Sequence, residues 1–481
     1  MNLFALARVL GGLGLALSAM LLVPLALSLA DGDGAQAGFF GAIAAGLGGG
    51  ASLLALGRRG SPDLTHREGF AVVTLGWFFF GVVGALPYRL TGALPTLVDA
   101  VFESLSGFTT TGATVLTDIE ALPRSLLLWR ATTHWLGGMG IIVLGLAILP
   151  MLGVGGMQMF RAEVPGPTAD RLRPRIQDTA KLLWGVYVLF TAAETLLLML
   201  GGLDWFEAVC HAFATMATGG FSTRNASVAG FGSAYVDAVI TVFMFLAGVN
   251  FALHHAALTG GWRRVLRNEE LRAYGLLTLG AVGILMIANA AGPYPDLLQN
   301  LRYSAFQAVS ILTTTGFGTA DYEAWPVVGQ VLLVLLMFIG GCAGSTGGGM
   351  KVSRVVLILK HAWAQLWALI HPRGVRLVKM DGRPVPPEVL QGVLGFFALY
   401  LLVTGGGALA MAALGVEPVT AVASVIACVG NIGPGLGDVG PVDNYAHLPQ
   451  TGKAVLTFCM LAGRLELFTV FVLFFPGAWR K

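Results

Sequence analysis

Long apolar runs separated by short polar stretches follow one another along almost the whole chain. The first two runs, about Val9–Leu29 and Gly38–Leu56, are separated by Asp31-Gly32-Asp33. Runs of about 20 apolar residues can cross a bilayer core of roughly 30 Å as helices. The first run is longer than the roughly 7–15 apolar residues of a secretory signal. We therefore expect a retained N-terminal helix hairpin over residues 1–60, with a cleaved signal as the alternative.

The remaining runs fall into four groups of the same kind, each with a long apolar run, a shorter run, a Gly-containing loop and a second long run. They predict four tandem units over residues 61–160, 161–262, 263–380 and 381–481. The shorter runs predict re-entrant half-helices over Leu97–Phe108, Phe206–Ala217, Ser304–Thr313 and Val419–Cys428. The flanking membrane helices are expected over about Phe70–Leu90, Leu126–Leu149, Ala180–Leu200, Val236–Leu258, Tyr274–Ala290, Val327–Leu369, Leu390–Leu414 and Ala454–Phe475. With the hairpin, this predicts an all-α polytopic membrane protein with ten transmembrane helices.

A short Thr- and Gly-containing motif follows each predicted half-helix. Its clearest copy is Thr313-Thr314-Thr315-Gly316, and its last copy, Val429-Gly430-Asn431, is degenerate. The central glycines are expected to be Gly112, Gly219, Gly316 and Gly430, whose near-equal spacing indicates an internal repeat. Non-helical backbone at membrane depth is tolerated where it lines a watery path, and four such loops could present rings of carbonyl oxygens to a dehydrated potassium ion. A role in close helix packing alone is the alternative.

Composition supports the membrane assignment. Hydrophobic residues make up 56% of the 481 residues and charged residues only 11%, whereas soluble domains carry roughly 25% charged residues. The four cysteines lie in apolar or re-entrant stretches without a CxxC spacing, which favours packing over disulfides or metal binding. They are Cys210, Cys342, Cys428 and Cys459.

The placement of charge predicts the orientation of the chain. Most of the 29 Lys and Arg residues lie in alternate connecting segments, namely 1–8, 58–69, 150–181, 259–273, 351–388 and the C-terminal tail. By the positive-inside rule both termini are then cytoplasmic, and the four loops lie toward the outer side. Acidic residues gather near those outer ends: Asp99, Glu103, Asp118, Glu120, Asp204, Glu207, Asp296, Asp321, Glu323, Asp438 and Asp443. An acidic mouth would concentrate cations, although several of these residues could simply be solvated.

A glycine-rich stretch, Gly340–Gly349, interrupts the return helix of the third unit. Glycine costs about 1 kcal/mol relative to alanine inside a helix, so a straight helix is not expected here. The spacing does not match a phosphate-binding G-x4-G-K-[ST] loop. We expect a loop at membrane depth, inward of the four motifs, that acts as a gate; a passive packing kink is the alternative.

Arg464 of the last helix and Glu194 of the second unit are charged residues deep inside predicted membrane helices. A charge at the bilayer centre costs at least about 2.5 kcal/mol and marks a functional site by default. Arg464 is expected to place a fixed positive charge on the path or to donate hydrogen bonds to the glycine-rich stretch. Glu466 lies on another helical face, so no ion pair with Arg464 is expected. The sequence does not indicate a partner for Glu194.

Together these features resemble the TrkH/TrkG/KtrB superfamily of bacterial potassium transporters. The resemblance rests on the four motifs, on GGCAGSTGGGMKVSR (Gly340–Arg354) and on AGRLELFT (Ala462–Thr469). The N-terminal hairpin is similar to the TrkH/TrkG branch. The resemblance implies four M1–P-loop–M2 units around a pseudo-fourfold pore, a homodimer in the bacterial cytoplasmic (inner) membrane, and a cytosolic TrkA-type ring that binds nucleotide. It implies potassium uptake, with K+ as the transported ion, no cofactor in this chain, no enzyme activity and no nucleic acid partner.

The resemblance also assigns roles to residues. The K+ filter would use backbone carbonyls of Thr110, Thr111, Gly112, Thr218, Gly219, Thr314, Thr315, Gly316, Val429, Gly430 and Asn431. The gate would comprise Gly340, Gly341, Gly344, Ser345, Thr346, Gly347, Gly348, Gly349 and Arg464. The fourth motif departs from the family pattern, which implies a less regular filter and modest selectivity.

Other classes of function remain open at this point. A proton- or sodium-coupled potassium symporter could also use broken helices, although such proteins are typically built from inverted repeats. An enzyme or scaffold is not favoured, because the histidines are scattered and the adjacent pair His254-His255 does not share a helical face. The basic stretches Arg171–Arg175 and Arg263-Arg264 could dock the regulatory ring or simply lie beside anionic lipid.

Overall fold

Helices make up most of the structure. The computed structural model describes residues 2–58, 66–147 and 172–479. The sheet in this part of the chain is a two-stranded antiparallel hairpin of β1 (Lys379–Met380) and β2 (Arg383–Pro384), in which Lys379 pairs with Pro384. The prediction of a helical protein is confirmed for the described residues.

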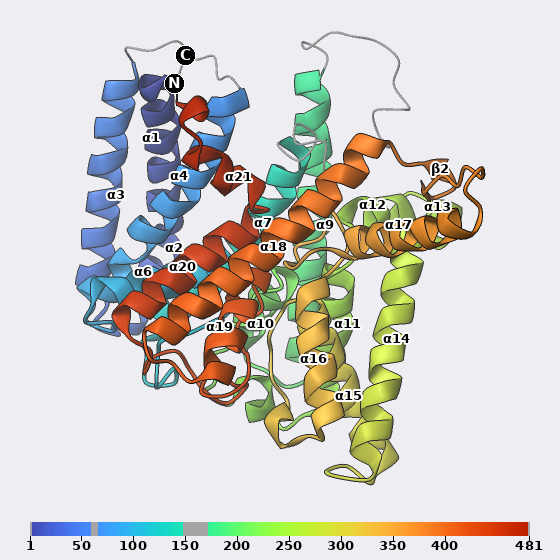
Figure 1. Cartoon of the computed structure of the whole chain (residues 1–481). Helices are drawn as coiled ribbons and strands as arrows, with labels where there is room; N and C mark the ends of the chain where they lie inside the picture. Colours follow the sequence, from blue (N-terminus) through green and yellow to red (C-terminus); the bar gives the residue numbers. More distant parts are fainter. Residues whose placement is uncertain (1, 59–65, 148–171, 480–481) are drawn as a thin grey trace.

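The N-terminal helices form a close hairpin (Figure 1). α1 (Leu3–Met20) and α2 (Leu22–Asp31) follow one another as one apolar stretch, and α3 (Gln36–Gly57) returns beside them. A Cβ on Gly11 would lie 2.7 Å from the Gly50 carbonyl oxygen. Small residues of this kind let membrane helices approach closely.

The other helices repeat one order four times: a long helix, a short helix, a loop and a return segment. The first set is α4 (His66–Gly84), α5 (Leu86–Leu90), α6 (Leu97–Phe108) and α7 (Arg124–Ala147). The second is α9 (Leu172–Leu200), α10 (Trp205–Met216), η2 (Ser227–Phe231), α11 (Ala234–Ala247), α12 (Phe251–Leu258) and α13 (Trp262–Arg267). The third is α14 (Glu269–Ala290), α15 (Leu297–Leu312), η3 (Tyr322–Ala324), α16 (Val327–Ile339) and α17 (Val352–Ile370). The fourth is α18 (Pro387–Ala413), α19 (Pro418–Gly430), α20 (Gln450–Arg464), α21 (Phe468–Phe471), η4 (Val472–Phe474) and η5 (Pro476–Ala478).

The short helices α6, α10, α15 and α19 are the four half-helices. A side chain caps the first turn of each by accepting a backbone N–H: Thr96 from Asp99, Asp204 from Glu207, Asp296 from Gln299 and Glu417 from Thr420. Such caps satisfy donors that a helix start leaves unpaired. The predicted bounds match α6, α10 and α19 to within two residues, whereas α15 begins at Leu297, well before the predicted Ser304.

Three return segments are broken, of which the sequence predicted one. The break at the glycine-rich stretch separates α16 from α17. In addition, α11 and α12 are bent by 101°, and α20 is bent by 110° from the helical segment Phe468–Phe474. The helices expected over about Val236–Leu258 and Ala454–Phe475 are therefore each interrupted by a bend.

Local chemistry explains these two bends. The Asn250 side chain accepts the Ala252 N–H at 2.9 Å and so starts α12 as a separate helix. At the second bend Glu466 and Leu467 have positive φ angles, of 62° and 48°, which a right-handed helix does not contain.

By length and composition, six helices in the described ranges can cross a membrane, or up to eight if each bent pair counts as one span. α7, α16 and α17 do not enter that count. In Figure 1 the two chain ends lie together at the top of the view, and the half-helices lie below them.

Candidate ion-conduction site

Each half-helix ends in a left-handed turn at one residue. These residues are Thr110 (φ 52°), Thr218 (φ 53°), Thr314 (φ 61°) and Asn431 (φ 55°). The next N–H in each loop donates to the carbonyl five residues earlier: Thr111 to Ser106, Gly219 to Ala214, Thr315 to Ser310 and Ile432 to Ala427. This is the Schellman arrangement, which closes a helix and turns the chain away from its axis. A β-branched residue with positive φ is a backbone outlier, and such strain clusters at functional sites.

Two residues farther on, each loop has a glycine with positive φ. These are Gly112 (80°), Gly220 (79°), Gly316 (82°) and Gly433 (94°). A Cβ on Gly112 would overlap the carbonyl oxygen of Gly219, on Gly220 that of Thr315, on Gly316 that of Ile432, and on Gly433 it would lie 2.7 Å from that of Thr111. The order runs from loop one to two, three, four and back to one. The four loops therefore form a closed ring in which glycine is required for close approach.

This geometry corrects the register that the sequence suggested for two loops. In the second loop the equivalent of Gly112 is Gly220, not Gly219, because Gly220 has the positive φ. In the fourth loop it is Gly433, and Gly430 is still the last residue of α19. The physical reason is that the left-handed turn falls on Asn431, so Val429 and Gly430 belong to the half-helix.

Side-chain hydrogen bonds hold the loops in place. The hydroxyls of Thr109 and Thr111 lie 2.7 Å apart, and those of Thr313 and Thr315 lie 2.8 Å apart. The Asn431 amide donates to the Thr111 hydroxyl at 3.0 Å and to the Met460 carbonyl at 2.9 Å. The first and fourth loops are thus joined directly.

The glycine-rich stretch Gly340–Gly349 lies against the C-terminal ends of the half-helices. The Gly348 N–H donates to the Thr314 hydroxyl at 2.6 Å, and the Gly349 N–H donates to the Gly430 carbonyl at 3.0 Å. The Thr346 hydroxyl donates to the Met216 carbonyl at 3.0 Å. Three of the four half-helix ends are therefore bonded to this stretch.

Arg464 also donates hydrogen bonds to the stretch. Its guanidinium, 2% exposed, donates to the Thr346 carbonyl at 2.7 Å and to the Gly137 carbonyl of α7 at 3.4 Å. The Lys351 ammonium donates to the Gly347 carbonyl. Of the two sequence-based roles for Arg464, hydrogen bonding to the glycine-rich stretch is the one that these contacts support.

The family model "TrkH: Cation transport protein" matches residues 37–479. The chain belongs to the TrkH family. This TrkH-family chain is 43% identical to the Trk system potassium uptake protein TrkH of Escherichia coli K12, with 100% of both covered, and 36% identical to its TrkG, with 88% of each covered. It superposes on the crystal structure of the potassium transporter TrkH from Vibrio parahaemolyticus with a TM-score of 0.91, 37% identity and full coverage of both chains. The predicted TrkH/TrkG membership is confirmed.

The other charged residues that the sequence placed in membrane helices have definite surroundings in this TrkH-family chain. Glu466 pairs with Arg354 of α17 and not with Arg464. The absence of a Glu466–Arg464 pair was expected, but Glu466 lies beyond the end of α20, so its position on a helical face is not the reason. The Arg354 guanidinium also lies 4.1 Å from the Phe396 ring centroid. Glu194 is fully buried beside Thr215 of α10.

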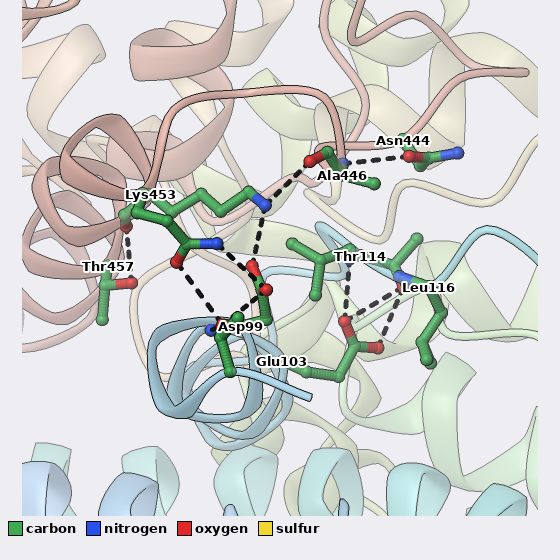
Figure 2. Close-up of polar contacts among 11 residues, drawn as sticks. Asp99, Glu103, Thr114, Leu116, Asn444, Ala446, Lys453 and Thr457 are labelled. Carbon is green, nitrogen blue, oxygen red and sulfur yellow. Dashed lines mark hydrogen bonds and ion pairs between the residues drawn. The ribbon is translucent and has the colours of Figure 1, made fainter. Parts of the chain in front are cut away.

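Buried ion pairs around the half-helices were missed from the sequence. Lys453 of α20 lies 2.7 Å from Asp99 of α6 and donates to the Ala446 carbonyl at 2.8 Å (Figure 2). Arg130 of α7 lies 2.7 Å from Glu103 of α6, and both are at most 2% exposed. Arg302 of α15 lies 2.7 Å from Asp237 of α11. A signal was present, since Arg130, Arg302 and Lys453 are the basic residues of otherwise apolar or half-helical stretches.

Four carboxylates that were predicted for an acidic mouth form a group near the N-terminal end of α19: Asp321, Glu323, Asp438 and Asp443. Asp438 is tied to that end by its N–H, which donates to the Thr420 hydroxyl at 3.0 Å. Burial raises the pKa of Glu323, and the other three carboxylates raise it further, against a hydrogen bond from the Gly437 N–H at 2.6 Å. By contrast, a hydrogen bond from the Asn225 side chain at 3.0 Å lowers the pKa of Asp118.

The remaining candidates are not brought together. The four cysteines are buried and free. The His254 Nε2 lies 2.8 Å from the Leu246 carbonyl. In the described parts of the chain, no three His, Cys, Asp or Glu side chains are placed so that together they could hold a metal ion. The side chains of Arg171–Arg175 lie outside the described residues. Arg263 and Arg264 lie on α13.

Proposed function

We propose that this protein is a potassium uptake channel-like transporter rather than an enzyme. The ring of four loops is the observation that carries the proposal. Each of its glycines lies close to a backbone carbonyl oxygen of the neighbouring loop. Rings of carbonyl oxygens can replace the hydration shell of K+. The relatives named as Trk system potassium uptake proteins point the same way.

The filter is assigned to the loop residues with these conformations. It comprises Thr110, Thr111, Gly112, Thr218, Gly219, Gly220, Thr314, Thr315, Gly316, Asn431, Ile432 and Gly433. Each half-helix directs its partially negative C-terminus toward this ring, which favours a cation there. Because Ile432 replaces the Thr or Gly of the other loops, the fourth side of the filter is chemically distinct.

The gate is assigned to Gly340–Gly349 with Arg464. The stretch is bonded to Thr314 and Gly430, and Arg464 donates a hydrogen bond to its Thr346 carbonyl. K+ would leave the filter toward this stretch, so its displacement would clear the path. A membrane potential contributes about 2.3 kcal/mol per charge per 100 mV to inward movement.

The architecture that goes with this function has ten spans in four M1–P-loop–M2 units. The units occupy residues 61–160, 161–262, 263–380 and 381–481, after a hairpin over 1–60. Adding α7 and the α16–α17 segment to the up to eight candidate spans gives ten. Both termini would be cytoplasmic in a bacterial inner membrane, by the positive-inside rule.

The partners proposed for this protein are a second copy of itself and a cytosolic TrkA-type ring that binds nucleotide. The Trk system names of the relatives support a multi-subunit system. The basic cytoplasmic segment 259–273, which includes Arg263 and Arg264, offers positive charge for docking at that face.

The test is ion flux into proteoliposomes that hold the purified protein, with K+ or Na+ gradients, a set membrane potential and no proton gradient. Potential-driven K+ flux larger than Na+ flux is expected. K+ flux that appears only with an added proton or sodium gradient would instead establish the coupled symporter.

A further inference from the structure

The same position on three half-helices carries a buried polar side chain that reaches the chain leaving the filter. Counting back seven residues from the left-handed turn gives Glu103, His211, Gln307 and Ser424 in the four half-helices. All four are fully buried, at 0% exposure. Their side chains are a carboxylate, an imidazole, an amide and a hydroxyl, so position rather than residue type is what they share.

In the first three half-helices this side chain bonds to the outgoing segment. Glu103 accepts the Thr114 hydroxyl at 3.0 Å and the Val115 N–H at 3.0 Å (Figure 2). The His211 Nε2 lies 2.9 Å from the Ser222 hydroxyl. Thr114 and Ser222 occupy equivalent positions, two residues after the ring glycines Gly112 and Gly220.

In the third half-helix, the residue of the outgoing segment that is bonded lies two positions farther along the chain than in the first two. The Gln307 side-chain amide donates to the Ala320 carbonyl at 3.1 Å. Ala320 lies four residues after Gly316, the ring glycine of that loop. The outgoing segment is still held from the half-helix, although at a later point.

The Glu103 and His211 side chains are themselves held by further hydrogen bonds. Arg130 donates from Nε to Glu103 at 2.7 Å and from Nη1 to the Ser222 carbonyl at 2.9 Å, which joins the two loops. The His211 Nδ1 lies 2.8 Å from the Glu207 carbonyl. A carbonyl only accepts, so Nδ1 carries the proton and Nε2 accepts the Ser222 O–H.

In the fourth unit, the outgoing segment is held by side chains from outside the half-helix. Ser424 is too short and donates to Ala421 of its own helix at 3.3 Å. Two tyrosines hold this loop instead: Tyr445 donates to the Gly433 carbonyl at 2.6 Å and Tyr322 to the Gly435 carbonyl at 2.7 Å. Every outgoing segment thus has a buried polar side chain that fixes it.

We propose that Glu103, His211 and Gln307 are positioning residues that set the outer half of the filter, and that discrimination between K+ and Na+ depends on them. The proposal rests on the proposed function. Backbone carbonyls select by their number and placement around the ion. A hydrogen bond that fixes the segment two residues beyond a ring glycine therefore limits how far that ring can contract around the smaller Na+.

The test changes the outgoing segment and leaves the half-helices intact. Thr114→Val removes the hydroxyl that bonds to Glu103, and Ser222→Ala removes the one that bonds to His211. Thr114→Ser and Ser222→Thr retain these hydroxyls. Ser104→Ala is the matched control, because the Ser104 hydroxyl is buried on α6 and has no hydrogen-bond partner in the described chain. The K+/Na+ permeability ratio is measured from reversal potentials of the purified full-length proteins in bilayers.

Thr114→Val and Ser222→Ala are each expected to lower the ratio about 5-fold, the scale of one hydrogen bond, while the hydroxyl-retaining variants stay within about 2-fold. A role in folding alone would reduce total flux and leave the ratio of the folded molecules unchanged. Unchanged ratios in both variants, or an equal fall in Ser104→Ala, would overturn the inference alone. Absence of K+-selective flux in the unmodified protein would overturn the proposed function and the inference with it.

Discussion

At the scale of single residues, the conducting loops depend on two backbone conformations that recur in each loop. A left-handed residue ends the half-helix, and a glycine two residues later lets the neighbouring loop approach. Three of the left-handed residues are threonines (Thr110, Thr218 and Thr314), where glycine would be less strained. The Thr314 hydroxyl accepts the Gly348 N–H, so the strained position also supplies a contact with the glycine-rich stretch.

Gly316→Ala is expected to reduce K+ flux at least about 10-fold or to abolish K+/Na+ discrimination. The added Cβ would overlap the Ile432 carbonyl oxygen, and the φ of 82° is unfavourable for an L side chain. Gly318→Ala is the matched control, since the nearest atom to its Cβ would be the Pro441 carbonyl oxygen, at 3.8 Å. Unchanged flux and selectivity in Gly316→Ala proteoliposomes would contradict the filter assignment.

A second prediction at this scale concerns pH. The pKa of Glu323 is raised, first by burial and then by Asp321, Asp443 and Asp438, so Glu323 takes up a proton at higher pH than an ordinary glutamate. Because its charged form is disfavoured in the folded protein, its contribution to stability is present at low pH and is lost as pH rises through its raised pKa. Protonation removes one negative charge from the acidic group, and the apparent affinity for external K+ is expected to weaken as the external pH falls through the raised pKa of Glu323.

The pH series is run on K+ flux with Glu323→Gln and with Asp118→Asn. Glu323→Gln should flatten the pH dependence above an ordinary glutamate pKa. Asp118→Asn should leave it in place, because the hydrogen bond from Asn225 lowers the pKa of Asp118 and keeps it charged in this range. An identical pH profile for Glu323→Gln and the unmodified protein would show that Glu323 does not act on K+ entry.

At the scale of helices, the sequence predicted three half-helices closely and failed where tertiary contacts decide. α6, α10 and α19 combine an apolar run with a capping residue, which are local signals. The start of α15 was missed because Gln299, Asn300 and Arg302 make it read as polar, yet Asn300 is buried and donates to the Met286 carbonyl at 2.9 Å. The register of the fourth loop depended on a left-handed Asn431. Asparagine favours this conformation at helix ends, but the preceding Gly430 was an equally good candidate in the sequence.

The breaks in the return helices were likewise predicted where a local sequence signal marks them and missed where a tertiary contact decides. The glycine-rich break was predicted from composition, because glycine weakens a helix wherever it occurs. The bend after Arg464 was not, because Leu465, Glu466 and Leu467 have no such preference. Glu466 leaves the helical path to pair with Arg354 of α17, a contact that is distant in sequence.

Arg464→Met is expected to raise basal K+ flux about 10-fold in the absence of a partner ring. The variant removes two hydrogen bonds that hold the glycine-rich stretch, at the Thr346 and Gly137 carbonyls, each a charge-assisted bond of about 1.5–3 kcal/mol. Arg464→Lys separates the two possible roles. It keeps the positive charge but lacks the fork that reaches both carbonyls, so flux should rise here too if anchoring matters. Basal flux in Arg464→Lys equal to that of the unmodified protein would assign the effect to charge alone.

At the scale of the whole molecule, two ion pairs join helices from different units. Lys453–Asp99 links α20 to α6, and Arg302–Asp237 links α15 to α11, each at 2.7 Å. In both pairs one partner lies on a half-helix and the other on the return helix of another unit. The charges are placed in opposite ways: the half-helix carries the acidic residue in the Lys453–Asp99 pair and the basic residue in the Arg302–Asp237 pair. These contacts fix half-helices relative to their neighbours, which the sequence could not reveal because the partners are far apart in it.

Removing one member of a buried pair leaves an uncompensated charge, so Lys453→Met should destabilise the folded protein by about 3 kcal/mol. Arg302→Met should cost less, because the Arg302 side chain is 28% exposed and that of Lys453 only 3%, and solvent screens exposed charges. The double variant Lys453→Met/Asp99→Asn should recover part of the loss, since the remaining carboxylate is neutralised. The measurement is the midpoint of thermal denaturation in detergent for the singles and the double. Equal midpoints for Lys453→Met and Arg302→Met would mean that the Lys453–Asp99 pair does not hold α6 against α20. A double variant Lys453→Met/Asp99→Asn that recovers none of the loss seen in Lys453→Met would mean the same.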